Sequence, residues 1–232
     1  MYFMDFLMGF DATFFLLVVP AMIFAAWAQF KVSSSFKKYS RERTTNGITG
    51  LQAAQEILRR AGIHDVRVER IQGHLTDHFD PRSNVIRLSD SVYDASSVAA
   101  VGVAAHEAGH AIQYAQGYAP MKVRAAIIPV TNLGSKLAMP LIFLGFLLQM
   151  LGLMYVGIIL FSTVALFQLV TLPVEFNASG RAVAALEGNA MLTSYELQGS
   201  KKVLTAAALT YVAALAMSLA QLLRFLAMAR RR

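Results

Sequence analysis

The chain has 232 residues, of which 56% are hydrophobic and 15% charged, and it contains no cysteine. Soluble globular proteins carry about 25% charged residues, so this composition favours contact with lipid. Without cysteine there is no disulfide framework and no thiolate metal site, so any metal must be held by histidine and carboxylate groups. The net charge of +7 does not indicate nucleic-acid binding, because the basic residues flank apolar segments, as in membrane proteins.

Residues 6–30 are predicted to form a transmembrane anchor. Their uninterrupted apolar part, 12–30, is long enough to cross roughly 30 Å of hydrocarbon as a helix. A cleaved signal peptide is the alternative, but that part is preceded by Asp5 and Asp11 and by no Lys or Arg. The positive-inside bias places the residues after the anchor in the cytoplasm. The basic residues that follow it are Lys31, Lys37, Lys38, Arg41 and Arg43.

Residues 31–130 are the most polar part of the chain and are predicted to form a domain of mixed α and β structure. Helix caps and glycine stops mark its helices, and alternating apolar and polar residues mark its strands. The first expected helix covers 47–61, with Thr49 as its N-cap and Gly62 as its stop. Strands are expected at 66–71, 75–79 and 85–88, with a hairpin turn at 80–84. A second helix is expected at about 97–116, and Gly117 ends it.

The second half of the chain is mainly apolar. Residues 137–172 are too long for one span and are predicted to form a transmembrane hairpin. Residues 173–202 are a polar, helical segment, and 203–228 form a last span or a membrane-associated helix. Four spans would leave the C-terminal arginines outside, against the positive-inside bias, so three and four spans both stay open. These arginines are Arg224, Arg230, Arg231 and Arg232.

The sharpest motif in the sequence is His106-Glu107-Ala108-Gly109-His110. Residues four apart share one helix face, so His106 and His110 are predicted to bind the same ion. Glu107 points partly away, where it can act as general base on a water held by that ion, as in zinc metalloproteases. The small apolar residues before the motif let other elements pack close to this helix. The alternative is a helix whose two histidines serve packing.

A catalytic zinc ion needs a third protein ligand. No histidine follows His110 and no aspartate follows Asp94, so the third ligand is an upstream histidine or a carboxylate. Glu175 is favoured, because it follows the apolar hairpin directly and a carboxylate there is costly unless it is paired or metal-bound. Its alternative role is a helix-start carboxylate favoured by the helix dipole. Glu187 and Glu196 are expected to be ordinary solvated residues.

A second metal site is not expected, because on one strand His74 and His78 would lie ~13 Å apart at ~3.3 Å per residue. Asp77 and His78 are instead predicted to line a groove in which an extended peptide pairs with their strand, and Asn177 is a further substrate-binding candidate. The oxyanion formed during hydrolysis needs a hydrogen-bond donor. The candidates are His78, Tyr114, Tyr195 and Arg181.

With these motifs, the chain resembles the YugP-type membrane zinc metallopeptidases of bacteria over nearly its whole length. The resemblance implies a membrane peptidase in membrane-protein quality control. More remotely it resembles the heat-shock and prenyl-protein membrane proteases, which implies His106, His110 and Glu175 as zinc ligands in a gluzincin-like domain; in those relatives an aspartate commonly stands where this chain has Ser179. The matching segments are 27–32, 73–82, 106–110, 117–120, 172–179 and 209–213.

The sequence thus predicts a mostly α, α+β zinc endopeptidase with about three or four transmembrane helices. It would bind Zn²⁺, lie in the cell membrane with its active site toward the cytoplasm, and act on peptide or membrane-protein substrates. The alternative function is a zinc-stabilised, non-catalytic membrane scaffold. A transporter is disfavoured, because the apolar segments hold few ionisable residues.

Overall fold

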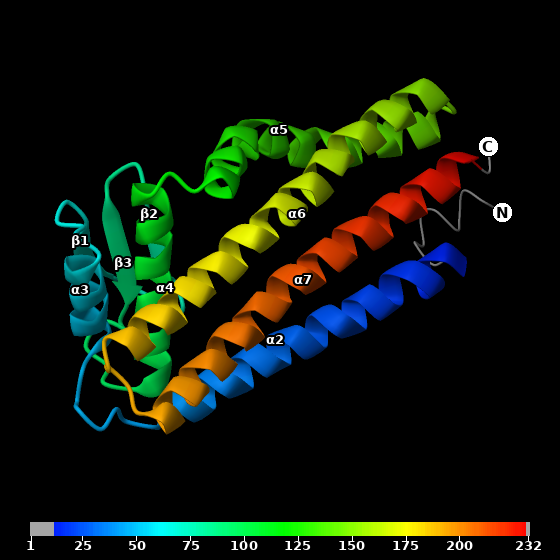
Figure 1. Cartoon of the computed structure of the whole chain (residues 1–232). Helices are drawn as coiled ribbons and strands as arrows, with labels where there is room; N and C mark the ends of the chain where they lie inside the picture. The colour runs from blue at the N-terminus through cyan, green and yellow to red at the C-terminus, as the bar shows by residue number, and fades with distance from the viewer. Residues whose placement is uncertain (1–11, 231–232) are drawn as a thin grey trace. The chain divides into compact units, whose positions relative to one another are not determined.

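A computed structural model describes residues 12–230, so residues 6–11 of the expected anchor, Arg231 and Arg232 lie outside the described part. The structure is mostly helical with one small sheet, as predicted. Figure 1 shows the elements in chain order. They are η1 (Phe14–Val18, a π-helical turn), α2 (Val19–Tyr39), α3 (Gly50–Arg60), β1 (Arg67–Ile71), β2 (His78–Asp80), β3 (Val85–Ser89), α4 (Val98–Ala115), α5 (Ala119–Leu147), α6 (Leu151–Gly188) and α7 (Ser194–Arg230).

The chain divides into two compact units. Among the described residues, the apolar unit consists of 12–29, Val123–Leu172 and 210–230, and the polar unit consists of Phe30–Lys122 and Pro173–Leu209. All four passages from one unit to the other fall within or at the end of a long helix. The third passage lies at Pro173, which has no N–H to donate to the carbonyl one helical turn earlier.

Four helices among residues 12–230 are long and apolar enough to cross a membrane. Many of their large apolar side chains are exposed, such as Ile159 at 65%, which suits contact with lipid. Helices α5 and α6 are joined by a short turn at 148–150 and contain residues 137–172, for which the sequence predicts a transmembrane hairpin. The four helices are Phe14–Tyr39, Ala119–Leu147, Leu151–Gly188 and Ser194–Arg230.

Glycines let α5 and α6 approach each other closely in the apolar unit. A Cβ on Gly145 would lie 2.5 Å from the backbone nitrogen of Met154, and one on Gly134 would lie 2.7 Å from the carbonyl oxygen of Leu160. Small residues at such crossings are typical of membrane helices, where packing replaces the hydrophobic effect. The same unit buries Arg224, whose guanidinium carbon lies 5.2 Å from the centre of the Phe14 ring.

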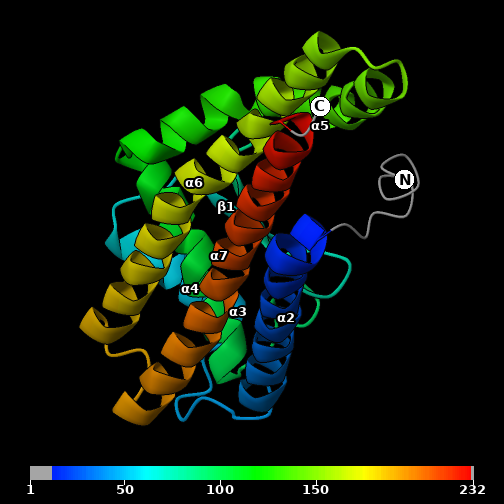
Figure 2. The ribbon, with the colours of Figure 1, turned by 90° about the vertical axis from the view of Figure 1, so that its right-hand side faces the viewer.

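The polar unit is built around α4, which packs against α3 and the sheet; Figure 2 shows α3 and α4 from another side. The predicted hairpin is present, because β2 pairs antiparallel with β3. The β1 strand also pairs with β3, but in parallel, which gives the order β1-β3-β2. A capping box between Thr49 and Gln52 starts α3, as the expected cap at Thr49 requires.

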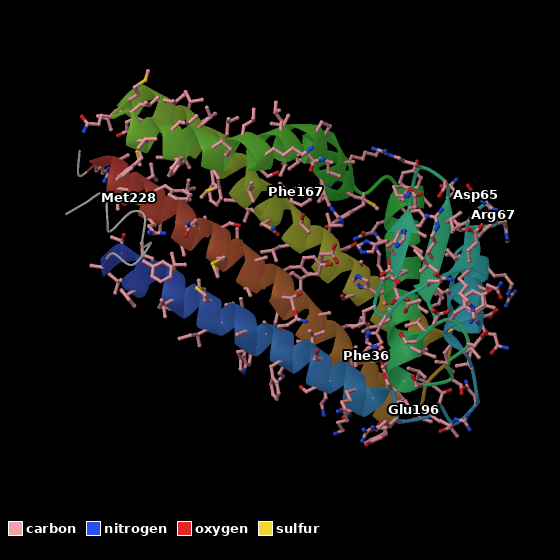
Figure 3. All side chains as sticks on the ribbon, turned by 180° about the vertical axis from the view of Figure 1, so that it is seen from behind. Phe36, Asp65, Arg67, Phe167, Glu196 and Met228 are labelled. Atoms are coloured by element: carbon pink, nitrogen blue, oxygen red, sulfur yellow. The ribbon has the colours of Figure 1, made fainter. Side chains whose placement is uncertain are left out.

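Glu196, expected to be solvated, is instead buried at 5% exposure in the first turn of α7, where Figure 3 labels it. Its Oε1 accepts hydrogen bonds from the backbone nitrogen (2.6 Å) and the hydroxyl (2.8 Å) of Thr45. Its Oε2 accepts one from the backbone nitrogen of Thr193 at 2.7 Å. The expectation failed because the burial of Glu196 depends on Thr45, which lies 151 residues away in the sequence.

We expect Glu196→Gln to lower the free energy of unfolding by about 1.5–3 kcal/mol, because the amide loses charge and one of its acceptor oxygens. Glu187→Gln is the control, since Glu187 is exposed on α6 and surface changes fall within about ±0.5 kcal/mol. Circular dichroism during denaturant unfolding in detergent measures both variants. Equal stability of the two would contradict the anchoring role of Glu196.

Candidate metal centre

The motif residues lie on α4, a helix that Ser97 caps by accepting a hydrogen bond from the backbone nitrogen of Ala100. The rings of His106 and His110 lie on one face, with centroids 4.7 Å apart and planes at 82°. Glu107 is only 7% exposed and has no hydrogen-bond partner among the described residues. The helix therefore presents two imidazoles together, with a buried carboxylate beside them.

Close packing between α4 and α6 completes the cluster. A Cβ on Gly109 would lie 2.5 Å from the carbonyl oxygen of Ala178, so only a glycine lets the two backbones come this close. About two turns before Gly109 on α4, Gly102 faces Ser200 of α7. The Ser200 hydroxyl donates a hydrogen bond to the carbonyl of Val98 at 2.9 Å. Gly102 is one of the small residues before the motif that are expected to allow close approach, whereas Gly109 lies within the motif itself.

This approach brings Glu175 of α6 to both histidines. Its Oε2 lies 3.3 Å from Nε2 of His106 and 3.5 Å from Nε2 of His110. One ligand atom from each of the three residues lies within 4.8 Å of the other two. Zinc–ligand bonds of about 2.0–2.1 Å in a tetrahedral site put donor atoms about 3.3–3.4 Å apart. The three side chains therefore fit a zinc ion, with a fourth position left for water.

The electrostatics of the cluster also favour a cation. Burial lowers the pKa of His110, but the carboxylates of Glu175 and Glu107 outweigh burial and raise that pKa overall. Glu175 is 2% exposed. Two buried carboxylates beside two imidazoles create a negative potential that a divalent ion would neutralise.

Each histidine also has a polar partner at its Nδ1 atom. The Ser179 hydroxyl lies 3.1 Å from Nδ1 of His106, and Oε1 of Gln113 lies 3.0 Å from Nδ1 of His110. Sequence analysis missed Gln113 as a site residue. Its position three residues after His110, on a helix buried among apolar residues, was the available signal, since a fully buried amide needs partners.

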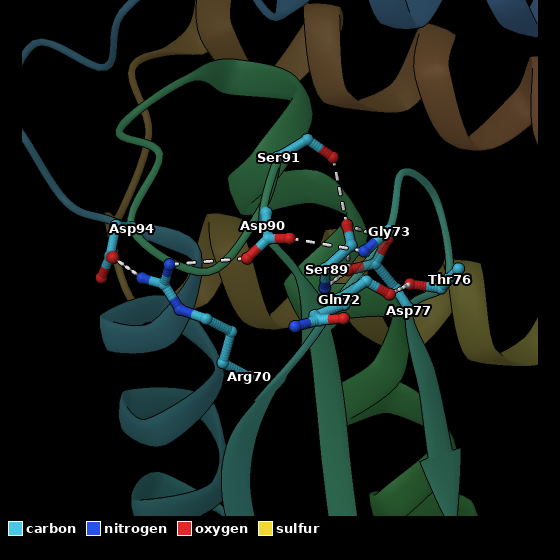
Figure 4. Close-up of polar contacts among 9 residues, drawn as sticks. All are labelled: Arg70, Gln72, Gly73, Thr76, Asp77, Ser89, Asp90, Ser91 and Asp94. Atoms are coloured by element: carbon cyan, nitrogen blue, oxygen red, sulfur yellow. Dashed lines mark hydrogen bonds and ion pairs between the residues drawn. The ribbon is translucent and has the colours of Figure 1, made fainter.

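Asp77, which is predicted to bind substrate, forms hydrogen bonds with Ser89 of the polar unit. It accepts hydrogen bonds from the backbone nitrogen (2.7 Å) and the hydroxyl of Ser89, as Figure 4 shows. Burial raises the pKa of Asp77, the bonds from Ser89 oppose this, and the charge of Glu107 raises it further. In the same view Asp90 holds the loop before Asp77 through the backbone nitrogen of Gly73.

The oxyanion-donor candidates lie in different settings. His78 lies on β2, with Nδ1 2.9 Å from the carbonyl of Thr76 and Nε2 3.5 Å from Arg87. Tyr114 lies on α4 with its ring 5.8 Å from that of Phe79, and Tyr195 is 67% exposed on α7.

Arg181, another donor candidate, is engaged at two of its nitrogens. Nε donates to Oδ1 of Asn177 at 2.7 Å, and a terminal nitrogen donates to Oε1 of Gln116 at 2.6 Å. Asn177 also accepts a bond from Gln113 at 2.9 Å. Both α6 side chains are thus tied to α4 rather than free for substrate.

A family model described as "Putative neutral zinc metallopeptidase" matches residues 14–230 of the chain. The chain belongs to this family. It is also 49% identical over 213 residues to "Putative membrane protease YugP" of Bacillus subtilis (strain 168), an alignment that covers 91% of this chain and 94% of that relative. No solved structure matches the chain significantly.

These comparisons agree with the geometry. The family and the relative support a zinc peptidase associated with a membrane, and the cluster of His106, His110 and Glu175 offers a site for the zinc that the family implies. The resemblance to YugP-type metallopeptidases is confirmed.

Gly109→Ala tests whether the approach of α4 to α6 builds the site. The methyl group would meet the Ala178 carbonyl, so we expect a loss of about 1–3 kcal/mol in the free energy of unfolding, as for overpacked cores, together with weaker zinc binding. Gly180→Ala is the control: it lies on α6 with nothing within 4 Å of its Cβ position, and we expect a gain of about 0.5–1 kcal/mol. Zinc titration and denaturant unfolding measure both. Unchanged zinc affinity in Gly109→Ala would contradict this account.

Proposed function

We propose that the chain is a membrane-embedded zinc endopeptidase with a gluzincin-like site, in which His106, His110 and Glu175 hold the ion and Glu107 is the general base. One observation carries the proposal: two imidazoles of α4 and one carboxylate of α6 lie together. Oε2 of Glu175 is 3.3 Å from Nε2 of His106 and 3.5 Å from Nε2 of His110. The buried Glu107 next to His110 supplies the fourth group that peptide hydrolysis needs.

The chemistry divides between the ion and the chain. Bound zinc lowers the pKa of a coordinated water toward ~7 and polarises the scissile carbonyl. Glu107 accepts the proton of the attacking water and passes it to the leaving amine nitrogen. The buried position of Glu107 suits this role, because a base with few competing partners keeps its lone pairs available. His78 is the proposed donor to the oxyanion, while Arg181 is tied to Asn177 and Gln116.

The position of β2 supports an extended peptide as substrate. In the order β1-β3-β2 it is an edge strand, and it also packs against α4. An edge strand offers unpaired backbone groups on one side, with which an extended peptide can pair. A peptide segment can bind in extended form only where the substrate protein is locally unfolded. The proposed substrates are therefore unfolded segments of membrane proteins, and their cleavage would contribute to membrane-protein quality control.

Two matched variants separate a ligand from a base. Glu175→Gln should lose most of its zinc, because a neutral amide is a poor ligand, whereas Glu107→Gln should keep one zinc per chain and lose cleavage by about 10²–10⁴-fold, the usual contribution of general-base catalysis. Elemental analysis in detergent and cleavage of an unfolded membrane-protein substrate provide the readouts. Zinc retained by Glu175→Gln would remove Glu175 from the ligand set. Zinc without cleavage in the wild type would favour the non-catalytic scaffold.

We further propose that the site faces the cytoplasm. If all four helices cross, α5 leads away and α6 leads back, so both segments of the polar unit lie on one side of the bilayer. The positive-inside bias favours the cytoplasm for that side, because basic residues gather where the helices meet the polar unit and outnumber the C-terminal arginines that four crossings would leave outside. The basic residues beside the polar unit are Lys31, Lys122, Arg124, Lys201 and Lys202.

The absence of cysteine from the chain permits a direct test of this orientation. Arg82→Cys, in the turn between β2 and β3, should be shielded from a membrane-impermeant maleimide in intact spheroplasts and labelled in inverted vesicles. Met150→Cys, 54% exposed in the turn between α5 and α6, should show the opposite pattern. Labelling of Arg82→Cys in spheroplasts would place the site outside.

A further inference from the structure

We propose that Gln113 is a positioning residue that fixes which nitrogen of His110 carries the proton, and that Asn177 and Arg181 fix the orientation of Gln113. This inference rests on the proposed function in one respect, namely that His110 binds a metal ion. Gln113 is 0% exposed and lies between His110 and helix α6.

The direction of each bond follows from groups that can only donate or only accept. Arg181 is a donor without acceptor capacity, so the atom of Asn177 that receives its Nε at 2.7 Å is the carbonyl oxygen. The same oxygen lies 2.9 Å from Gln113, so the Gln113 atom facing it is the amide nitrogen. The Val174 carbonyl, an acceptor only, lies 2.8 Å from that nitrogen and independently requires the same orientation.

The orientation of Gln113 then dictates the state of His110. With Nε2 of the amide committed to Val174 and Asn177, Oε1 faces Nδ1 of His110 at 3.0 Å. An amide oxygen accepts hydrogen bonds only, so Nδ1 must carry the proton, and the lone pair of the neutral ring lies on Nε2. Nε2 is the atom 3.5 Å from Glu175. The relay thus points the lone pair of His110 at the metal position.

His106 differs in this respect. Its Nδ1 faces the hydroxyl of Ser179 at 3.1 Å, and a hydroxyl can donate or accept. Ser179 therefore supports the ring without dictating its tautomer. The neutral amide at His110 also differs from a carboxylate partner, because it directs the proton without placing a third negative charge in a site that already buries Glu107 and Glu175.

Gln113→Leu and Gln113→Glu form the first test. Both side chains are close to Gln in size, but only Glu, ionised or protonated, accepts the proton of His110 Nδ1. We expect Gln113→Leu to weaken zinc binding roughly 10–100-fold, the usual cost of losing an outer hydrogen bond to a ligand. Gln113→Glu should weaken it less, because it keeps the acceptor for Nδ1 of His110 although it loses the amide donor to Val174 and Asn177. Competition with a chromogenic chelator measures this. Equal affinities for both variants would overturn the proposal.

A spectroscopic signature separates positioning from general stability. The chain has five histidines, so ¹⁵N-histidine labelling gives a simple spectrum in which the zinc-loaded wild type should show a slowly exchanging Nδ1–H of His110. Gln113→Leu should lose this resonance and Gln113→Glu should keep it. Its persistence in Gln113→Leu would overturn the proposal, whatever the thermal stability of the variant.

Asn177 provides a second pair, which remains informative if Gln113→Leu does not fold. Asn177→Asp keeps an oxygen that accepts from Gln113 and Arg181 and should match the wild type. Asn177→Leu leaves Val174 as the single acceptor and should lower zinc affinity by less than Gln113→Leu; no loss would remove Asn177 from the relay. A wild type that binds zinc but cleaves no peptide would refute the endopeptidase function and leave the positioning role intact.

Discussion

The candidate metal centre depends on the close contact of α4 with α6 at Gly109. The two imidazoles come from one helix and the carboxylate from another, so the site exists only where the helices approach to backbone distance. Gly109 supplies that approach, since a Cβ would lie 2.5 Å from the Ala178 carbonyl. Gly109, which has no side chain to take part in the chemistry, therefore sets the distance between the two histidines of α4 and the carboxylate of α6.

Hydrogen bonds between the same two helices hold the contact at a fixed register. Gln113 of α4 reaches the Val174 carbonyl and Asn177 of α6, and Arg181 returns from α6 to Gln116. A shift of either helix by one residue would break all of these bonds and also carry Glu175 away from His106 and His110. Ligand geometry and helix register are thus stabilised by one network, which is why residues outside the ligand set matter to the site.

The sequence was sufficient for features that depend on local pattern. Helix caps, apolar segments and the spacing of His106 and His110 are set within a few residues, and the mostly helical fold with a small sheet was predicted from them. The parallel pairing of β1 with β3 and the burial of Glu196 were not, because both depend on partners far along the chain. The interpretation of Glu175 lies between these cases. Its position directly after the apolar segment favours it as a ligand, but only the fold shows it beside the histidines.

Helix α6 runs without interruption from Leu151 to Gly188, so one helix contains both an apolar segment long enough to cross a membrane and Glu175, the proposed third ligand. Pro173, two residues before Glu175, removes one backbone hydrogen bond at the point where the apolar unit ends and the polar unit begins. The ligand is therefore separated from the apolar segment by a local weakness of the helix, while Gln113 binds the Val174 carbonyl directly after it. The network proposed to orient His110 thus also holds the first turn beyond Pro173, and with it the proposed ligand Glu175, in place.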